Sequence, residues 1–401
     1  MVGEEFFAKR LGEAFSASII PYISGKGAVS VDDSDNVQQV SWELNVSVKG
    51  EALLVLSGSI ILQDNQFFGL KGKSHNGVYE IICDKIFILS YSETINEENI
   101  LDTICICSPK QLELNQLGWD EKRVSVVKGY IQNLDYKVKK FSAVVDNIEI
   151  IFEHRDNYER IRSLKNDCII DRAIFSSLKV SLNDKISIND VEIIFKKVPW
   201  MLSLVQINAC FCGILEYSDT KKNKRIVVKN NLLSSPFHRH AIINNTIDLR
   251  NFLENCSEKF HKLHKDINMR ILISWLLGTY EGKFIENKIA GLILSYEYLL
   301  TRYLISCGCS ENKVKGMNIQ EKLKKLNKDE LRFIPTEYLK DKLRDGVRNH
   351  LFHQGYLPFM SLPEKSDFFD KYFDLIIHII LKILGYNGNY ISPIDQKPHK
   401  T

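Results

Sequence analysis

Hydrophobic and polar residues alternate along much of the chain from Val29 to about Asn230. Segments with period-two alternation or runs of β-branched residues are separated by turn residues such as Asn76-Gly77, a pattern typical of short strands. Strands are predicted over residues 40–48, 52–62, 78–89, 124–131, 141–152, 186–195 and 205–217. We therefore expect a β-rich, sandwich-like domain in this part of the chain.

Two helices are also predicted within the first 240 residues. Residues 1–19 have the amphipathic spacing of a helix that leads into the strands, and residues 156–165 predict a short helix between them. Further turns are expected at Asp64-Asn65, Asn183-Asp184 and residues 221–224, which hold most of the densest basic cluster, Lys221-Lys222-Asn223-Lys224-Arg225. This cluster is interpreted as a solvated hairpin tip or as a contact for a phosphate backbone.

After Asn245 the apolar residues recur every three to four positions, which indicates helices. Thr336 after Pro335 suits a helix N-cap, and Gly308 and Gly355 suit helix ends. Helices are predicted over residues 249–266, 268–277, 285–306, 319–326, 336–353 and 365–384. The fold class is therefore predicted as α+β: a β-rich domain over residues 1–240, followed by a helical bundle over residues 241–401.

Charge and composition narrow the choice of function class. The 401 residues include 53 Lys and Arg against 50 Asp and Glu, and 44% are hydrophobic, which is typical of a globular chain and excludes a disordered one. The net charge of +3 divides into −2 for residues 1–240 and +5 for residues 241–401. This modest excess is compatible with an anionic partner such as nucleic acid, and equally with an ordinary solvated surface.

The cysteines and the apolar segments predict the compartment. Nine cysteines, an odd number spread over a long chain, suggest reduced thiols rather than a disulfide framework. Glu4 and Glu5 stand where a secretory signal would be basic, and the apolar stretch 375–384 is too short to span a membrane. We expect a cytoplasmic protein that does not insert into a membrane.

The residues that carry chemistry stand near the end of the fifth predicted helix of the second domain. Arg348 and His353 lie about 140° apart in a regular helix, whereas Asn349 and His353 share a face. Because Gly355 ends the helix, the backbone around His353 can deviate and bring the imidazole toward Arg348. Arginine offers a planar fork for a phosphate, histidine exchanges protons near neutral pH, and Asn349 can orient His353.

This arrangement resembles the HEPN superfamily, in which Arg, a polar residue and His stand in the same spacing on the penultimate helix of a helical bundle. Within the superfamily, the chain is most similar to the ApeA-like anti-phage proteins, which have a β-rich N-terminal domain. The resemblance covers residues 245–390 and includes the acidic-aromatic stretch 295–300 of the third helix, with Glu297 at its centre. The first domain resembles the family in architecture only.

The resemblance implies an endoribonuclease that needs no metal or other cofactor and acts as a homodimer, with the two motifs facing each other. His353 would be the general acid or base, Arg348 would stabilise the phosphorane, and Asn349 would position the groups. RNA is the implied substrate, and a phage-derived trigger is the implied ligand of the first domain. The alternative is a non-catalytic binding protein whose helices dimerise and whose β-rich domain recognises a ligand, since cations also stabilise helix ends without catalysis.

Other residues are weaker candidates for the same site. Lys324 and Lys325 are candidate RNA contacts, His350 is interpreted as an RNA contact or as a bystander, and Glu297 is interpreted as an ion-pair residue or a substrate contact. A zinc site from Cys210, Cys212, His238 and His240 is a further hypothesis, although the spacing matches no familiar zinc motif and buried cysteines commonly serve as apolar filler. The pairs Cys105/Cys107 and Cys307/Cys309 also leave metal binding open.

Overall fold

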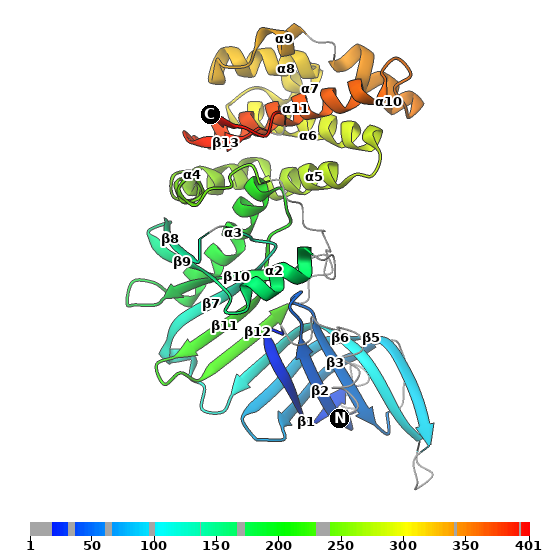
Figure 1. Cartoon of the computed structure of the whole chain (residues 1–401), viewed down its shortest axis with the longest axis vertical. Helices are drawn as coiled ribbons and strands as arrows, with labels where there is room; N and C mark the ends of the chain where they lie inside the picture. The colour runs from blue at the N-terminus through cyan, green and yellow to red at the C-terminus, as the bar shows by residue number, and fades with distance from the viewer. Residues whose placement is uncertain are drawn as a thin grey trace.

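The computed structural model describes residues 18–30, 37–60, 66–95, 101–136, 138–166, 173–229, 241–340, 343–392 and 394–401. The predicted helix over residues 1–19 and the turn at Asp64-Asn65 fall almost entirely outside these ranges. Figure 1 shows a strand-rich end that holds β1–β6, a middle layer that holds β7–β12 with α2 and α3, and a helical end that holds α4–α11.

Strands β1–β6 close into a barrel. Neighbouring strands pair antiparallel in the order β3-β2-β1-β4-β5-β6, and a further pairing of β3 with the first part of β6 closes the ring. The sandwich that the alternation predicts for this part of the chain is therefore wrong. The strands are β1 (Ile20–Ser30), β2 (Val37–Val46), β3 (Ala52–Gly58), β4 (Gln66–Ser74), β5 (Tyr79–Ile95) and β6 (Leu101–Gln116).

Trp42 of β2 fills the interior of this barrel and is fully buried. Glycines on β1 and β4 give the indole ring its room. A β-carbon added at Gly25 would lie 2.5 Å from the Trp42 ring, and one added at Gly72 would lie 2.6 Å from the indole nitrogen. The two glycines therefore allow a large aromatic side chain to occupy a narrow barrel.

The sheet continues beyond the barrel, because the second part of β6 pairs with β12. The order from there is β6-β12-β11-β7-β10-β9-β8, so the described residues contain one twelve-stranded sheet. These strands are β7 (Val124–Gln132), β8 (Lys140–Val145), β9 (Ile148–His154), β10 (Ile174–Ser181), β11 (Phe211–Asp219) and β12 (Lys224–Lys229). The predicted hairpin tip at residues 221–224 joins β11 to β12.

The predicted strand over residues 186–195 is wrong, because this segment belongs to helix α3 (Ile188–Gln206). The Ser187 hydroxyl accepts from the Asp190 N–H at 3.2 Å, and the Asp190 carboxylate accepts from the Ser187 N–H at 3.0 Å. This capping box satisfies two N–H groups that the first helical turn leaves open. The predicted short helix over 156–165 is confirmed as α2 (Tyr158–Asn166).

The helical end follows the predicted pattern closely, and the expected limits of two helices, 285–306 and 319–326, are confirmed. The segment 336–353 is not one regular helix: it holds α9, the π-helical turn η4 and α10. Helix α6 contacts α4, α5, α7, α8, α10 and α11 and is the centre of this part. The helices are α4 (Thr246–Ile267), α5 (Met269–Glu281), α6 (Ile285–Ser306), α7 (Glu311–Gly316), α8 (Ile319–Leu326), α9 (Thr336–Lys340), η4 (Leu343–Arg348), α10 (Asn349–Gln354) and α11 (Leu362–Ile383).

Helix α3 joins the sheet to the helical end, and one hydrophobic core runs through both. The buried ammonium of Lys197 on α3 binds the Asp146 carboxylate in the β8–β9 turn and donates to the Ser257 hydroxyl of α4 at 2.7 Å. Ser257 in turn donates to Asp146 at 2.7 Å. At the edge of the sheet, the Val144 N–H of β8 donates to Glu254 of α4 at 3.0 Å. The two sides of the predicted division at residue 240 thus share one hydrophobic core.

His378 of α11 is expected to make the protein less stable as the pH falls. Burial, together with the positive charge of Lys382 and the nearby His399, lowers the pKa of this imidazole to about 4. In the unfolded chain a histidine takes up its proton near pH 6.5, so the unfolded state binds more protons between these values. Stability is therefore present above about pH 6.5 and is lost as the pH falls toward 4.

Because His378 is only half-buried, solvent screens part of this effect, and we expect the free energy of unfolding to fall by about 1 kcal/mol between about pH 7 and about pH 5 on its account. The His378→Phe variant should lose this contribution, as measured by urea unfolding at both pH values. Replacing the exposed His75 in the same way should leave the difference unchanged. An identical pH dependence in the wild type and in His378→Phe would contradict the prediction.

Candidate functional site

The predicted motif lies where the π-helical turn η4 passes into α10. Arg348 is the last residue of η4, and Asn349, His350 and His353 lie on α10. Gly355 ends the helix in a left-handed conformation with φ of 78°, and its N–H donates to the Leu351 carbonyl at 3.0 Å. The helix end predicted from Gly355 is therefore confirmed, and His353 lies in the final turn.

Arg348 is held by Glu297 of the central helix α6. The Arg348 Nε donates to Glu297 Oε1 at 2.6 Å, and the two side chains are 37% and 31% exposed. The guanidinium also lies 5.5 Å from the centre of the Phe352 ring. Within the described residues, the two η nitrogens of Arg348 make no hydrogen bond. Glu297 therefore orients the fork and leaves its outer edge open to an anion.

A second cation, Lys322 of α8, lies beside this pair. Its ammonium donates to the Thr301 hydroxyl at 2.9 Å, and Thr301 is one turn after Glu297 on the same face of α6. Burial lowers the pKa of Lys322, Glu297 acts to raise it, and Arg348 acts to lower it again. We name Glu297, Thr301, Lys322 and Arg348 the cation cluster. It holds two positive groups and one carboxylate.

The sequence does not single out Lys322, although a signal for it exists. Residues 319, 322, 323 and 326 form the apolar stripe of α8, and Lys322 occupies a stripe position where a hydrophobic residue is expected. A lysine on the buried face of an amphipathic helix needs a partner inside the protein. That requirement, applied to the lysine-rich segment 313–328, would have identified Lys322 as the buried member.

The remaining motif residues are open to solvent to different degrees. Asn349 is half-buried and His353 is exposed. Within the described residues, the imidazole of His353 makes no hydrogen bond, and no side-chain hydrogen bond joins it to Asn349. An orienting role for Asn349 stays a prediction. His353 lies at the surface one turn beyond the cation cluster, where an imidazole can exchange protons with a bound molecule.

The weaker candidates His350, Lys324 and Lys325 have different surroundings. His350 approaches Gln354 at 3.2 Å and its ring lies 5.0 Å from that of Phe359. Lys325 forms an ion pair with Asp329 at 2.6 Å, whereas Lys324 is exposed on the surface of α8. The structure therefore brings Glu297 to Arg348, and it occupies Lys325 with a different carboxylate.

Cys210 is buried, and Cys212 is half-buried. Burial raises the pKa of Cys210 and of Cys212 to about 12, so both hold their protons at neutral pH. In the described part of the chain, no group of three or more His, Cys, Asp or Glu residues is placed to hold a metal ion. His238 and His240, the other half of the zinc hypothesis, lie outside the described residues.

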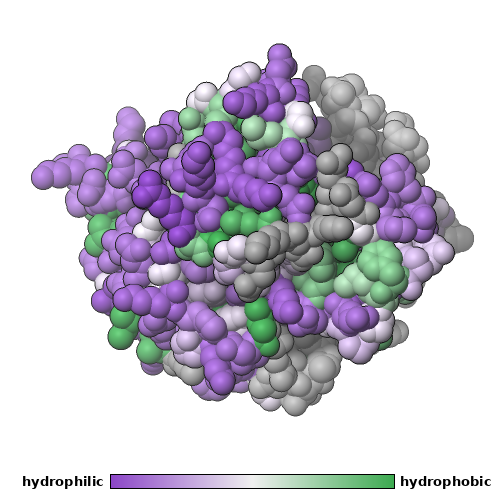
Figure 2. Space-filling model, turned by 90° about the horizontal axis from the view of Figure 1, so that it is seen from above, coloured by the Kyte–Doolittle hydropathy of each residue, from purple (hydrophilic) through white to green (hydrophobic). Residues whose placement is uncertain are grey.

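Large hydrophobic side chains are exposed around α10, namely Phe352, Tyr356 and Phe359. Figure 2 looks onto this helical end of the molecule and shows a largely hydrophilic face with hydrophobic side chains gathered near its middle. Exposed aromatic residues beside a charged motif are typical of surfaces that bind other molecules.

Among the helices of the described ranges, none combines the length and the apolar character that crossing a membrane requires. Searches against protein-family models and against curated proteins find no match to this chain.

Proposed function

We propose that the protein is an endoribonuclease of HEPN type that cleaves RNA without a metal ion. The observation that supports this best is the cation cluster: Glu297 orients Arg348, Lys322 adds a second charge, and an exposed imidazole, His353, follows in the next turn. A pair of fixed cations beside a proton-transfer group suits a phosphodiester.

The reaction is an internal transfer at phosphorus. The RNA 2′-hydroxyl loses its proton to an imidazole, its oxygen bonds to the adjacent phosphorus, and the bond from phosphorus to the 5′-oxygen breaks as that oxygen takes up a proton. The products are a 2′,3′-cyclic phosphate and a 5′-hydroxyl. His353 transfers protons, and Arg348 stabilises the extra negative charge on the phosphorane through its η nitrogens.

The chain contributes one such motif, whereas the reaction needs a base and an acid. We propose that two chains form a homodimer through their helical ends, so that the second histidine completes the site. The barrel and adjoining strands then recognise a trigger of phage origin or restrain the nuclease, and the protein acts in the cytoplasm as an abortive-infection effector.

The decisive experiment is cleavage of labelled RNA by the purified full chain in excess EDTA. We expect cleavage that survives chelation and products that end in a 2′,3′-cyclic phosphate. A double variant, Arg348→Ala with His353→Ala, purified in parallel, should be inactive, whereas His75→Ala should cleave like the wild type. Equal cleavage by the double variant would assign the activity to another source and overturn the proposal.

The exposed aromatic side chains around α10 favour a second candidate, a binding protein without catalysis. In that case Glu297 and Arg348 form a structural ion pair, and Phe352, Tyr356 and Phe359 contact a partner chain. The same preparations separate the two functions. A chain that dimerises in sedimentation measurements but leaves RNA intact in the presence and absence of EDTA supports the binding protein.

A further inference from the structure

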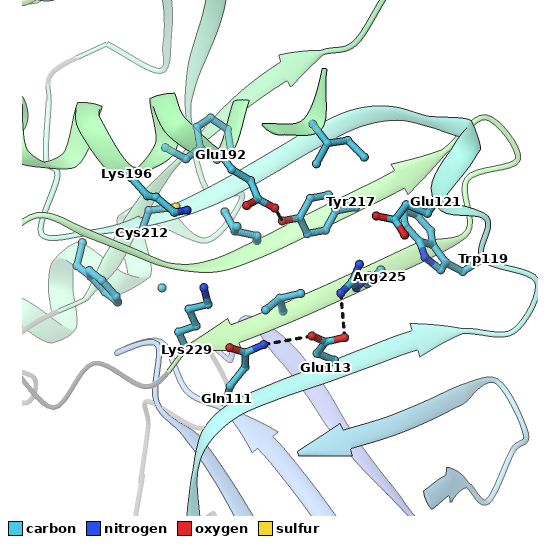
Figure 3. Close-up of a pocket in the computed structure, with 16 residues that line it drawn as sticks. Gln111, Glu113, Trp119, Glu121, Glu192, Lys196, Cys212, Tyr217, Arg225 and Lys229 are labelled. Atoms are coloured by element: carbon cyan, nitrogen blue, oxygen red, sulfur yellow. Dashed lines mark hydrogen bonds and ion pairs between the residues drawn. The ribbon is translucent and has the colours of Figure 1, made fainter. Parts of the chain in front are cut away.

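A pocket of about 230 Å³ lies on the sheet far from α10, between helix α3 and strands β6, β11 and β12. Figure 3 shows its lining side chains. The strand register explains why polar groups converge there: Lys229 lies directly opposite Gln111, and Arg225 lies directly opposite Tyr217. Alternate residues of each strand share one face of the sheet, so these side chains all point to the same side.

The two ends of the pocket differ in chemistry. At one end lie Lys196 of α3 and Lys229 of β12, both exposed (Figure 3). Within the described residues, neither side-chain ammonium has an ion-pair or hydrogen-bond partner. At the other end lie Trp119 and Glu121. Trp119 meets Tyr217 edge-on, with ring centres 6.5 Å apart and planes at 61°. Trp119 is half-buried and lines the pocket.

The middle of the pocket contains hydrogen-bonding groups that are already positioned. The Tyr217 hydroxyl donates to Glu192 at 2.6 Å, and Arg225 forms an ion pair with Glu113 at 3.0 Å. Gln111 donates to the same Glu113 at 3.1 Å. These carboxylate and amide oxygens are acceptors for ring N–H and amino groups.

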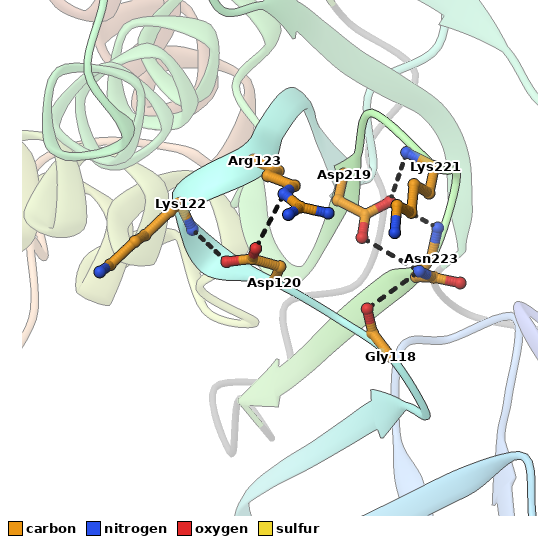
Figure 4. Close-up of polar contacts among 7 residues, drawn as sticks. All are labelled: Gly118, Asp120, Lys122, Arg123, Asp219, Lys221 and Asn223. Carbon is orange, nitrogen blue, oxygen red and sulfur yellow. Dashed lines mark hydrogen bonds and ion pairs between the residues drawn. The ribbon is translucent and has the colours of Figure 1, made fainter.

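The rim that holds Trp119 is fixed by two interlocked turns, shown in Figure 4. The amide of Asn223, in the β11–β12 hairpin, donates to the Gly118 carbonyl at 3.0 Å, next to Trp119. Asp219 is 2% exposed and accepts from the N–H groups of Lys221 and Asn223, each at 2.8 Å. On the other side of Trp119, Asp120 accepts from the Lys122 N–H at 3.0 Å. The aromatic end is therefore preorganised.

A second hollow, of about 360 Å³, adjoins the pocket and shares Glu113, Trp119 and Arg225 with it. Together the two spaces are in the range of sites for small ligands. A ligand that matches both ends needs an anionic group for the lysines, a planar ring for Trp119, and ring donors for the central acceptors. Inorganic phosphate meets one of these requirements, and an uncharged aromatic compound meets the other two.

We propose that this pocket binds a free mononucleotide, with its phosphate at Lys196 and Lys229 and its base against Trp119. The proposal does not depend on the nuclease activity, because it uses none of the residues of the cation cluster. It gives the strand-rich part of the chain a small-molecule ligand of defined chemistry.

Isothermal titration calorimetry of the full chain with AMP, GMP, CMP and UMP tests the proposal. We expect at least one of them to bind, and the double variant Lys196→Ala with Lys229→Ala to weaken its binding by at least about tenfold, because hydrogen bonds to charged groups are lost. Trp119→Ala should weaken binding about tenfold through lost stacking. Trp119→Phe, which keeps an aromatic ring in the rim, should bind with intermediate affinity and guards against misfolding.

A matched double variant, Lys139→Ala with Lys185→Ala, removes two exposed lysines outside the pocket and should leave the affinity unchanged. Ribose 5-phosphate and the nucleoside, each tested alone, should bind more weakly than the complete nucleotide. The proposal is overturned if none of the nucleotides binds at millimolar concentration, if the pocket variants bind as the wild type does, or if only a 5′-phosphorylated RNA binds.

Discussion

Replacing Arg348 by alanine is expected to lower the rate constant for RNA cleavage by about 1000-fold, because one preorganised donor to a developing oxyanion contributes on that scale. Arg348→Lys should recover only part of the rate, since a lysine keeps the charge and loses the planar fork. Single-turnover cleavage of a labelled RNA measures the rate constant directly. Arg250→Ala, which removes an exposed arginine from α4, is the matched control and should have no effect.

Glu297 tests whether the ion pair positions Arg348. Glu297→Gln keeps the size of the side chain but loses its charge. The contact between the side chain of residue 297 and the Arg348 Nε, 2.6 Å long with glutamate, is therefore weaker. We expect a smaller loss of rate than in Arg348→Ala, and no additional loss when Glu297→Gln is combined with Arg348→Ala, because Glu297 acts through Arg348. Independent, multiplicative losses would show that Glu297 contacts the RNA itself. Wild-type rates in Arg348→Ala would refute the role of Arg348 in the chemistry.

The second large effect concerns stability. Asp146→Ala is expected to lower the free energy of unfolding by about 2 kcal/mol, because it leaves the ammonium of Lys197, which is 7% exposed, without its counter-charge. The Asp146 side chain is 41% exposed, and solvent therefore reduces the loss below that of a fully buried pair. Burial raises the pKa of Asp146, but the hydrogen bonds from Lys197 and Ser257 outweigh it and lower the pKa below its usual value.

Urea unfolding of single and double variants measures this coupling. Lys197→Met removes the buried charge together with the need for a partner, so the double variant Asp146→Ala/Lys197→Met should be more stable than Asp146→Ala alone. Lys196→Met changes the neighbouring exposed lysine and should shift the free energy by no more than about 0.5 kcal/mol. A double variant whose losses simply add would show that the ion pair does not join α3 to the β8–β9 turn energetically.

The helical end was predictable because its signals are local. The apolar stripes of 285–306 and 319–326, with caps next to them, fix both position and length. The segment 186–195 shows how such a signal is missed: its apolar residues fit a strand as well as a helix, and Ser187 and Asp190 decide between them. The run also continues to Val205, which is too long for a typical strand.

The barrel and the pocket depend on pairings that no local pattern reveals. Alternation in β3 and β6 is the same whether the two strands lie in a sandwich or close a barrel, and their pairing joins Leu54 to Cys107. In the same way, the convergence of Lys229, Gln111 and Trp119 follows from the register of distant strands. The motif at Arg348 and the ion-pair candidate Glu297 were both visible in the sequence, but that the two pair with each other follows only from the placement of η4 against α6.

The position of β12 determines the order in which the sheet can be completed. This strand lies between β6 and β11, yet it is the last strand of the sheet to leave the ribosome. Until Lys229 has been synthesised, β6 and β11 each present an edge without its partner, and the closing contacts join residues about 110 positions apart, such as Asn115 and Arg225. The nascent chain is therefore most prone to aggregation just before its sheet is complete, and helices α4–α11 are translated after that period.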